Sequence, residues 1–328
     1  MDRGDIGREQ RGVVTRAQAL RAGMTLAEIT HRVRSGRWQR LFAGVYATFT
    51  GPVSREVWRW AAVLRAGEGA VLSHRSAAEE VGLCRASQGP LHVTVPAARR
   101  VTAPGGVVVH RCRHVRERRH PSRQPPQTRI EETILDLAVG VPPEEAMGWI
   151  AAACGARLTT ADRLRRALRR RGFVPGRPVL TSLLDDAAEG CASVLEWRYL
   201  REVERAHSLP APARQWRRPR SGGYWYDDLY YPGERLRIEL DGQAAHPAET
   251  RWRDYRRDNA AVQSGDTVLR YSTGDIFDDP CRVAGQVADV LQRGGWPEPA
   301  QPCGPGCGLL PADPGRDWIV EGASLPVL

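Results

Sequence analysis

Carboxylates are frequent in residues 226–242, and their spacing raises the first question about chemistry. The dipeptide Pro232-Gly233 within this run is typical of a tight turn, because proline suits the first central position and glycine the second. A turn at this point predicts a β-hairpin. If the two residues that flank the turn pair with each other, Asp228 lies opposite Arg237 on the neighbouring strand.

The same hairpin brings three carboxylates to one face, because side chains alternate along a strand. Asp228, Glu239 and Asp241 share that face, whereas Asp227 points towards the core side. Diagonal neighbours on paired strands lie roughly 7 to 8 Å apart, so two carboxylates can hold one divalent cation, Mg²⁺ or Mn²⁺. Such a cation activates water and neutralises charge on a scissile phosphate in nucleases. The alternative is a hairpin edge whose acids are solvated and paired with arginine.

A second group of residues, near the N-terminus, has the spacing of a helix-turn-helix. Helices are expected over 15–22 and 25–35, each capped by the threonine at its start, with Gly23 in the turn between them. Two helices joined by a short glycine-containing turn can place the second helix in the major groove of DNA. The stretch 38–47 is then expected to form a β-wing.

The second of these helices is expected to be apolar on one side and basic on the other. Leu26, Ile29 and Val33 repeat at helical spacing and should pack inward. The DNA-binding candidates are polar residues of the cap and the helix and the arginines that follow: Thr25, Glu28, His31, Arg32, Arg34, Arg37 and Arg40. The alternative is a small helical bundle with a solvated arginine face.

Net charge favours a polyanionic partner. The 328 residues have a formal net charge of +10, and all 48 basic residues are arginine, which makes bidentate contacts with phosphate and guanine. Residues 1–50 contain nine arginines and four acidic residues and so contribute half of that excess. The alternative is that an arginine-only basic set reflects the codon bias of a GC-rich genome. Together with the helix-turn-helix, the charge predicts double-stranded DNA as the partner.

The remaining bulk features concern compartment and cysteine chemistry. No apolar run approaches the roughly 20 residues of a membrane span, and the first ten residues lack the apolar stretch of a secretory signal, so we expect a soluble, cytoplasmic protein with no membrane partner. Seven cysteines are spread along the chain and predict neither a disulfide framework nor a zinc module. His110, Cys112 and His114 alternate along an apparent strand, which argues against a metal site there.

The order of the elements predicts a multidomain protein of α+β and α/β class. We expect a winged helix-turn-helix over 1–50, an α+β connecting domain over 51–175, a folded domain over 190–293 and a disordered tail over 294–328 that is rich in proline and glycine. A linker is expected at 175–178. In the connecting domain the patterns predict helices over 57–66, 129–138, 142–153 and 160–171 and strands over 91–95 and 107–110. The last folded domain is expected to contain a helix, three strands, a helix, a strand and a helix.

Two groups of motifs resemble known families. The C-terminal motifs resemble the very-short-patch-repair (Vsr)-like endonuclease family of the PD-(D/E)XK superfamily: Ser193-Val194-Leu195-Glu196, Asp228, Glu239-Leu240-Asp241-Gly242, His246, Asp254, Arg257-Asp258 and Val268-Leu269-Arg270-Tyr271. The N-terminal motifs are similar to the AbiEi-type antitoxin family and its winged helix: Gly12-Val13-Val14-Thr15-Arg16, Arg37-Trp38-Gln39-Arg40-Leu41, Gly44-Val45-Tyr46 and Leu72-Ser73-His74-Arg75-Ser76-Ala77-Ala78.

The nuclease resemblance implies a restriction-endonuclease-like mixed sheet flanked by helices over 190–293. It implies Asp228 and Glu239 as metal ligands, with Glu196 on the preceding helix as a third. Ser193 to Glu196 is also a capping box, which gives Glu196 an equally good structural explanation.

The chain departs from the superfamily pattern at Asp241, which occupies the lysine position of the Glu-x-Lys tripeptide. Lysine there orients the attacking water or stabilises the charged phosphate, and an ionised aspartate cannot donate a hydrogen bond. Gln243 and His246, and also Arg257, are the nearby residues that could take this role.

Two functions of different classes follow from these features. The first is a metal-dependent DNA endonuclease that holds its substrate through the winged helix. The second is an antitoxin-type transcriptional regulator whose nuclease fold is a catalytically silent binding or dimerisation module. The second hypothesis brings with it a toxin-system partner and a homodimer.

Overall fold

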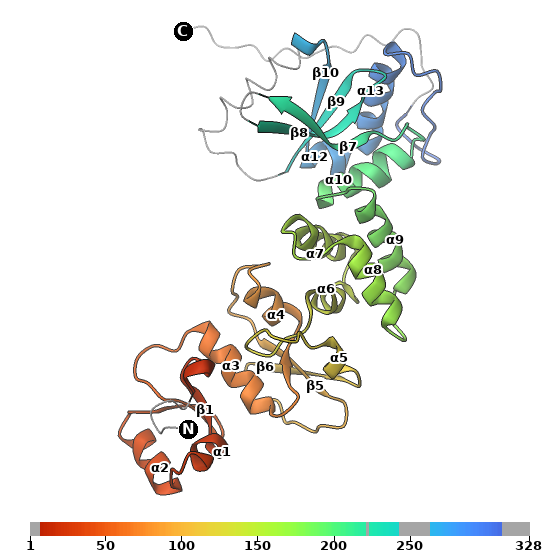
Figure 1. Ribbon diagram of the computed structural model, residues 1–328. Helices are drawn as coiled ribbons and strands as arrows, with labels where there is room; N and C mark the ends of the chain where they lie inside the picture. Colours follow the sequence, from red (N-terminus) through yellow and green to blue (C-terminus); the bar gives the residue numbers. More distant parts are fainter. Residues whose placement is uncertain (1–6, 221–222, 243–262, 310–328) are drawn as a thin grey trace. The chain divides into compact units, whose positions relative to one another are not determined.

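The computed structural model describes residues 7–220, 223–242 and 263–309. The chain is mixed α+β and divides into two compact units, Met1–Ala188 and Glu189–Leu328 (Figure 1). Among the described residues, no helix has both the length and the apolar character needed to cross a membrane.

The first unit begins with a helix-turn-helix and a small antiparallel sheet. The elements are η1 (Arg8–Gln10), β1 (Val13–Thr15), α1 (Arg16–Arg21), α2 (Leu26–Arg34), β2 (Gln39–Phe42) and β3 (Val45–Ala47), with sheet order β1-β3-β2. Both predicted helices are confirmed, and each starts at a capping box formed by the expected threonine, Thr15 or Thr25. The β2–β3 hairpin turns at Gly44, whose φ of +75° is in the left-handed region that favours glycine.

Helix α2 packs on the rest of this region through fewer apolar residues than its pattern predicts. Ile29 is buried with Val14, Ala19, Met24 and Trp38, and Val33 packs partly against this cluster. The prediction that Leu26 packs inward was wrong, because its side chain is 57% exposed. Leu26 is the first residue of α2, where the helix leaves the turn and is not yet in contact with the cluster.

The rest of the first unit is a three-stranded sheet and a series of helices. The strands are β4 (Val71–Leu72), β5 (Leu91–Pro96) and β6 (Val107–Cys112), in the order β4-β5-β6, with β5 and β6 parallel. The helices are α3 (Arg55–Ala66), α4 (His74–Glu80), α5 (Val115–Arg118), α6 (Ile130–Ala138), α7 (Pro143–Gly155), α8 (Ala161–Arg170) and α9 (Arg177–Ala188). The predicted helices and strands are confirmed to within two residues at nearly every end.

The expected linker at 175–178 was wrong in its second half, because α9 begins at Arg177. Pro178 lies in the first turn of this helix, where a missing backbone N–H breaks no hydrogen bond. Arg177 connects the start of α9 to the end of α8, donating from Nη1 to the Leu168 carbonyl over 2.9 Å. A proline that marks a linker in sequence therefore marks a helix start in the fold.

The second unit is built on a mixed four-stranded sheet. Its elements are α10 (Val194–Arg198), the π-helix η2 (Tyr199–Arg205), β7 (Ala213–Arg220), β8 (Gly223–Tyr231), β9 (Leu236–Asp241), β10 (Thr267–Ser272), α12 (Thr273–Asp278) and α13 (Pro280–Arg293). The sheet order is β10-β9-β8-β7, with β9 and β10 parallel and the other pairs antiparallel. Most of the segment in which a helix is expected between β9 and β10 lies outside the described residues, and its last part, Gln263 and Ser264, is helical.

The register of the β8–β9 hairpin differs from the prediction by two residues. Arg237 pairs with Tyr230 rather than with Asp228, and Tyr231 pairs with Leu236. The loop contains four residues instead of two, and its last residue, Arg235, has a φ of +55°. Because the strand period is two, the shift moves every partner but keeps each side chain on its predicted face.

The segment after α13 also differs from the prediction, which made it part of a disordered tail. Trp296 is buried in the core of the second unit, and Ala300 and Leu309 pack against that core. The Gln301 amide donates to the His207 carbonyl over 2.8 Å. Proline and glycine made this segment look unstructured, but one large aromatic side chain fixes it to the core. The rest of the predicted tail, residues 310–328, lies outside the described residues.

Candidate nucleic-acid interface and carboxylate site

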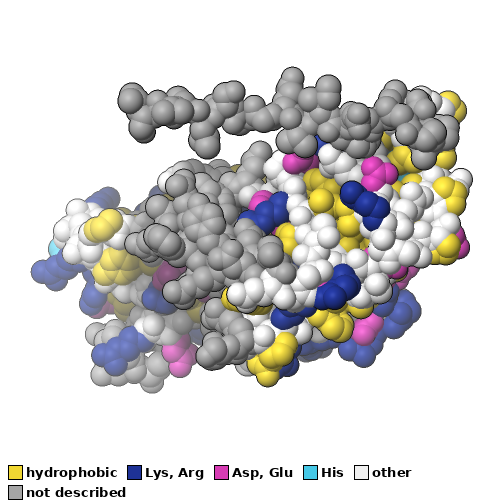
Figure 2. Space-filling view, turned by 90° about the horizontal axis from the view of Figure 1, so that it is seen from above, with side chains coloured by type: hydrophobic (Ala, Val, Ile, Leu, Met, Phe, Trp, Pro, Cys, Tyr) yellow, Lys and Arg dark blue, Asp and Glu magenta, His cyan; other side chains and the backbone are white. Residues whose placement is uncertain are grey.

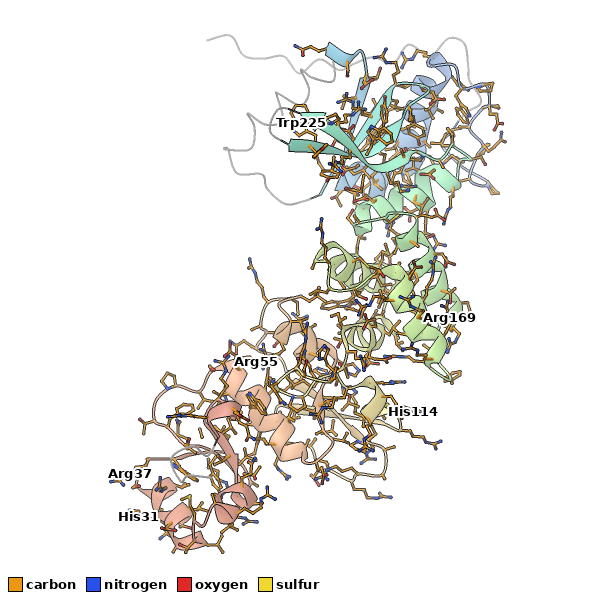
Figure 3. All side chains as sticks on the ribbon, viewed as in Figure 1. His31, Arg37, Arg55, His114, Arg169 and Trp225 are labelled. Carbon is orange, nitrogen blue, oxygen red and sulfur yellow. The ribbon has the colours of Figure 1, made fainter. Side chains whose placement is uncertain are left out.

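The seven DNA-binding candidates at and after α2 all have exposed side chains. Figure 3 shows two of them, His31 and Arg37, projecting outward from α2 and from the turn that follows it. This arrangement gives the helix-turn-helix a polar surface on the side opposite its buried cluster, which is the side available to a partner.

Two of the candidates have a structural task in the capping box. Thr25 Oγ1 accepts from the Glu28 backbone N–H over 3.2 Å, and Glu28 Oε2 accepts from the Thr25 backbone N–H over 2.6 Å. These bonds fix the start of α2, which is the end that approaches base edges in helix-turn-helix proteins. A contact of Thr25 or Glu28 with DNA stays a prediction.

Among the basic candidates, Arg32 packs against an aromatic ring of the protein, whereas the side chains of Arg34, Arg37 and Arg40 extend into solvent. The Arg32 guanidinium lies 5.5 Å from the centre of the buried Trp38 ring. Arg34, Arg37 and Arg40 make no salt bridge to any carboxylate in the described part of the chain. An exposed guanidinium with no internal carboxylate is free to pair with phosphate.

Exposed apolar side chains accompany these arginines. Leu20 on α1 and Leu26 on α2 are 40% and 57% exposed. Apolar side chains at a recognition helix can contact the thymine methyl group in the major groove. On the face seen from above in Figure 2, arginine side chains lie in separate groups with carboxylates near them.

In the second unit, α10 and β8 bring two of the predicted metal ligands near each other. Glu196 is buried, and its carboxylate accepts from the Ala192 amide over 3.0 Å and from the Ser193 hydroxyl over 3.1 Å. Burial raises the pKa of Glu196, hydrogen bonds from Ala192 oppose this change, and the nearby charge of Asp228 adds to it. Ser193 caps α10 by accepting from the Glu196 backbone N–H, but the Glu196 carboxylate accepts from the Ala192 N–H instead of the Ser193 N–H, so only half of the predicted capping box forms.

Asp228 lies where strands β8 and β9 separate. Its Oδ2 accepts from the Leu240 backbone N–H over 2.9 Å, so a side chain replaces the next rung of the β-ladder. The last paired residues are Leu229 and Ile238, so Asp228 and the buried Glu239 are the residues that directly follow the end of the paired ladder on each strand.

Asp241 lies at the exposed end of β9, beyond Glu239. Gln243 and His246, the other two predicted catalytic residues, fall outside the described residues, as do Asp254, Arg257 and Asp258.

Arg237, which the predicted register places opposite Asp228, has Asp266 as its partner in the structure. It donates from Nε to Asp266 Oδ2 over 2.8 Å and also lies 3.9 Å from buried Asp227, which pairs with Arg218. These arginines and aspartates form a separate buried ion cluster.

Sequence reasoning missed two polar residues beside the carboxylates. Gln215 on β7 donates from Nε2 to Glu196 Oε2 over 3.3 Å, and its φ of +48° is unusual for a strand residue. Arg270 on β10 is the parallel pairing partner of Glu239 and so shares its face of the sheet. Nothing in the sequence marks Gln215, whereas the β9–β10 pairing would have identified Arg270.

A histidine cluster in the first unit was also missed. His74 and His110 stack with ring centres 3.7 Å apart, and His92 Nδ1 lies 3.0 Å from His110 Nε2. Burial lowers the pKa of His74 to about 3 and that of His110 to about 4, with neighbouring histidines adding to both changes. One ring nitrogen from each of His74, His92 and His110 lies within 4.8 Å of one from the other two, and the lowered pKa values of all three favour the neutral form of the imidazoles.

Comparison with known proteins identifies only the N-terminal region. Residues 8–48 match the family described as "Transcriptional regulator, AbiEi antitoxin". The chain is also similar to a solved structure, that of the RV2827C protein from Mycobacterium tuberculosis, with 17% sequence identity and a TM-score of 0.39. The matched region covers 60% of this chain and 78% of that protein. That likeness is too low to support an argument about function. No curated protein matches the chain.

The family match coincides with the helix-turn-helix and its wing. It spans η1 to β3, and it includes all seven DNA-binding candidates. The match supports a DNA-binding regulatory role for this region. It does not extend to the C-terminal carboxylates.

Proposed function

We propose that the protein is a DNA-binding regulator that reads double-stranded DNA through α2 and the arginines that follow it. The observation that supports this most directly is a set of exposed arginines, Arg34, Arg37 and Arg40, that pair with no carboxylate of the described residues and lie in a helix-turn-helix region matching a family of transcriptional regulators. Helix α2 would enter the major groove, and the β2–β3 hairpin would contact the adjacent backbone.

Selection of bound sequences from a random duplex pool tests this proposal. A single preferred sequence is expected, with the affinity of Arg32→Ala and Arg34→Ala reduced and with a steep dependence on salt. Arg169→Ala, an exposed change on α8, is the matched control and should bind as the wild type does. Enrichment of no sequence above the starting pool would refute sequence-specific regulation.

The partners that accompany this function are a toxin-system protein and a second copy of the chain. Helix-turn-helix dimers bind two half-sites about one helical turn apart. A palindromic selected site would support the homodimer, whereas a single half-site would support a monomer on DNA.

A second function, metal-dependent cleavage of DNA, is supported by a different observation. Glu196, Asp228 and Glu239 come from α10, β8 and β9, and the sheet runs as three antiparallel strands followed by a fourth strand parallel to the third. This arrangement is compatible with the PD-(D/E)XK fold that the sequence resembles.

The donor chemistry of these residues fits Mg²⁺ or Mn²⁺, which bind oxygen ligands. Asp228 and Glu239 would hold the ion, and Glu196, whose carboxylate already accepts three hydrogen bonds, would act as the more distant ligand. When bound, the ion would supply water activation and charge neutralisation. Arg270 and Gln215 are the described residues placed to orient a phosphate or a water in the absence of the usual lysine.

Nicking of supercoiled DNA with Mg²⁺ or Mn²⁺ tests the second function. Cleavage by the wild type that disappears in the Asp228→Ala/Glu239→Ala double variant, with DNA binding retained, would support it. Cleavage that survives the double variant would place the activity elsewhere. No cleavage by the wild type on any substrate, with binding retained, would leave the regulator with a silent nuclease-like unit.

A further inference from the structure

Four side chains with metal-binding atoms converge in the second unit, away from the carboxylates. They are His207, Cys281, Cys303 and Cys307, and their ligand atoms all lie within 4.8 Å of one another. They come from three separate places: the turn after η2, the first turn of α13 and the segment that follows α13. The sequence predicted no zinc module, because two of these residues are far from the only close cysteine pair.

The distances among these atoms match a tetrahedral zinc site. The Cys281 sulfur lies 3.7 Å from that of Cys303 and 3.6 Å from that of Cys307, and the Cys307 sulfur lies 3.5 Å from His207 Nε2. Zinc–sulfur bonds of about 2.3 Å and zinc–nitrogen bonds of about 2.0 Å at tetrahedral angles separate two sulfurs by about 3.8 Å and a sulfur from a nitrogen by about 3.5 Å. A disulfide requires about 2.05 Å between its sulfurs. The spacing therefore fits ligands around one ion better than a disulfide.

The imidazole is held in the orientation that a metal ligand needs. His207 is fully buried, and its Nδ1 lies 3.0 Å from the Val203 carbonyl oxygen. A carbonyl can only accept, so Nδ1 carries the proton and Nε2 offers its lone pair towards Cys307. A hydrogen bond from the second ring nitrogen to a carbonyl is the usual support of a metal-bound histidine.

The close cysteine pair lies in a turn whose geometry suits a metal site. The sequence Cys303-Gly304-Pro305-Gly306-Cys307 has three residues between the ligands, within the spacing of two to four found in structural zinc sites. The Cys307 amide donates to the Gly304 carbonyl over 3.1 Å. Gly306 has a φ of +82°, which a glycine adopts without strain.

We propose that His207, Cys281, Cys303 and Cys307 bind one zinc ion that fastens the segment after α13 to the second unit. Four protein ligands leave no open position for a substrate, so the ion is structural. Thiols in simple van der Waals contact would give similar sulfur–sulfur distances, but they would not require a buried imidazole directed at the same point. The ion would also account for the packing of a segment whose composition predicts disorder.

Metal content of the full-length protein, purified without a polyhistidine tag, tests the proposal. One zinc per chain is expected, and replacement by Co²⁺ should give the visible absorption bands of a tetrahedral thiolate site. Cys303→Ser is the main variant, because Cys303 is exposed and its change disturbs packing least. It should lose most of the bound metal, whereas Cys112→Ser in the first unit should keep it.

A chelator provides a readout that does not depend on any variant. Removal of zinc from the folded wild type should lower its melting temperature, and added zinc should restore it. Wild type that carries no zinc after expression in zinc-supplemented medium, and that gives no cobalt bands, would overturn the proposal. A disulfide between any two of the three cysteines in protein purified under reducing conditions would overturn it as well.

Discussion

The arginines after α2 allow a quantitative test of the DNA-binding proposal. In the variant Arg34→Ala/Arg37→Ala/Arg40→Ala, three exposed guanidinium groups without carboxylate partners in the described part of the chain are removed. If each neutralises one phosphate, the slope of log K against log salt concentration becomes shallower by about 0.9 per arginine, or about 2.7 in total. Between 50 and 200 mM salt, the wild type should then lose roughly 40-fold more affinity than the variant does.

Fluorescence anisotropy of a labelled duplex over a series of salt concentrations measures both slopes. The matched control is Arg166→Ala/Arg169→Ala/Arg170→Ala on α8, which removes the same charge from exposed positions. Figure 3 shows Arg169 on α8, in a different part of the first unit from His31 and Arg37. The control should keep the wild-type slope, and circular dichroism should confirm that both variants are folded.

Two outcomes would refute this reasoning. An unchanged slope in the α2 variant would mean that these arginines do not contact phosphate. Equal changes in both triple variants would mean that net charge, rather than the helix-turn-helix surface, controls binding.

Further predictions concern stability and catalysis. Glu79→Ala should destabilise the first unit by about 3 kcal/mol, because the buried Arg59 guanidinium lies 3.1 Å from Glu79 and would keep only its second carboxylate, Glu80. Urea unfolding measures the free energy of unfolding, and a loss below about 1 kcal/mol would contradict the prediction. The pKa is lowered from 6.5 to about 3 for His74 and to about 4 for His110 in the folded chain. Below pH 6.5 the unfolded chain therefore binds more protons than the folded chain, and the free energy of unfolding should fall as the pH drops towards 4. Melting temperatures that stay constant over this range would count against neutral buried histidines. Asp241→Lys should increase Mg²⁺-dependent nicking if the lysine is the missing group, and a gel assay with no gain would show that the site lacks more than that residue.

Local chemistry made the helix-turn-helix predictable. Each cap needs only a threonine and an acceptor or donor three residues later, as in Thr25 and Glu28, so the signal lies within one turn of sequence. Leu26 was mispredicted because helical spacing identifies a stripe of residues but not how far along the helix the neighbouring elements extend.

In the C-terminal unit, the alternation of side chains along the strands could be predicted from the sequence, but the pairing register of β8 and β9 could not. Strand alternation is insensitive to a shift by two, so the face shared by Asp228 and Glu239 could be derived although the turn was two residues longer than expected. The contact of Gln215 with Glu196 depends on the positive φ of Gln215, which the type of this residue does not predict. The cluster of His207 with three cysteines arises from tertiary packing between distant segments, which composition and spacing do not report.

The two units also differ in how much chain must be synthesised before their cores can close. The cluster around α2 is complete once Tyr46 has been made, so the surface that we propose binds DNA can form early while translation continues. The core of the second unit includes Leu195 and Trp296, so it stays open until about a hundred further residues have been added. A nascent chain would therefore acquire its DNA-binding surface well before the carboxylate unit is folded, and a ribosome that stalls between the two would release a chain that can occupy DNA without that unit.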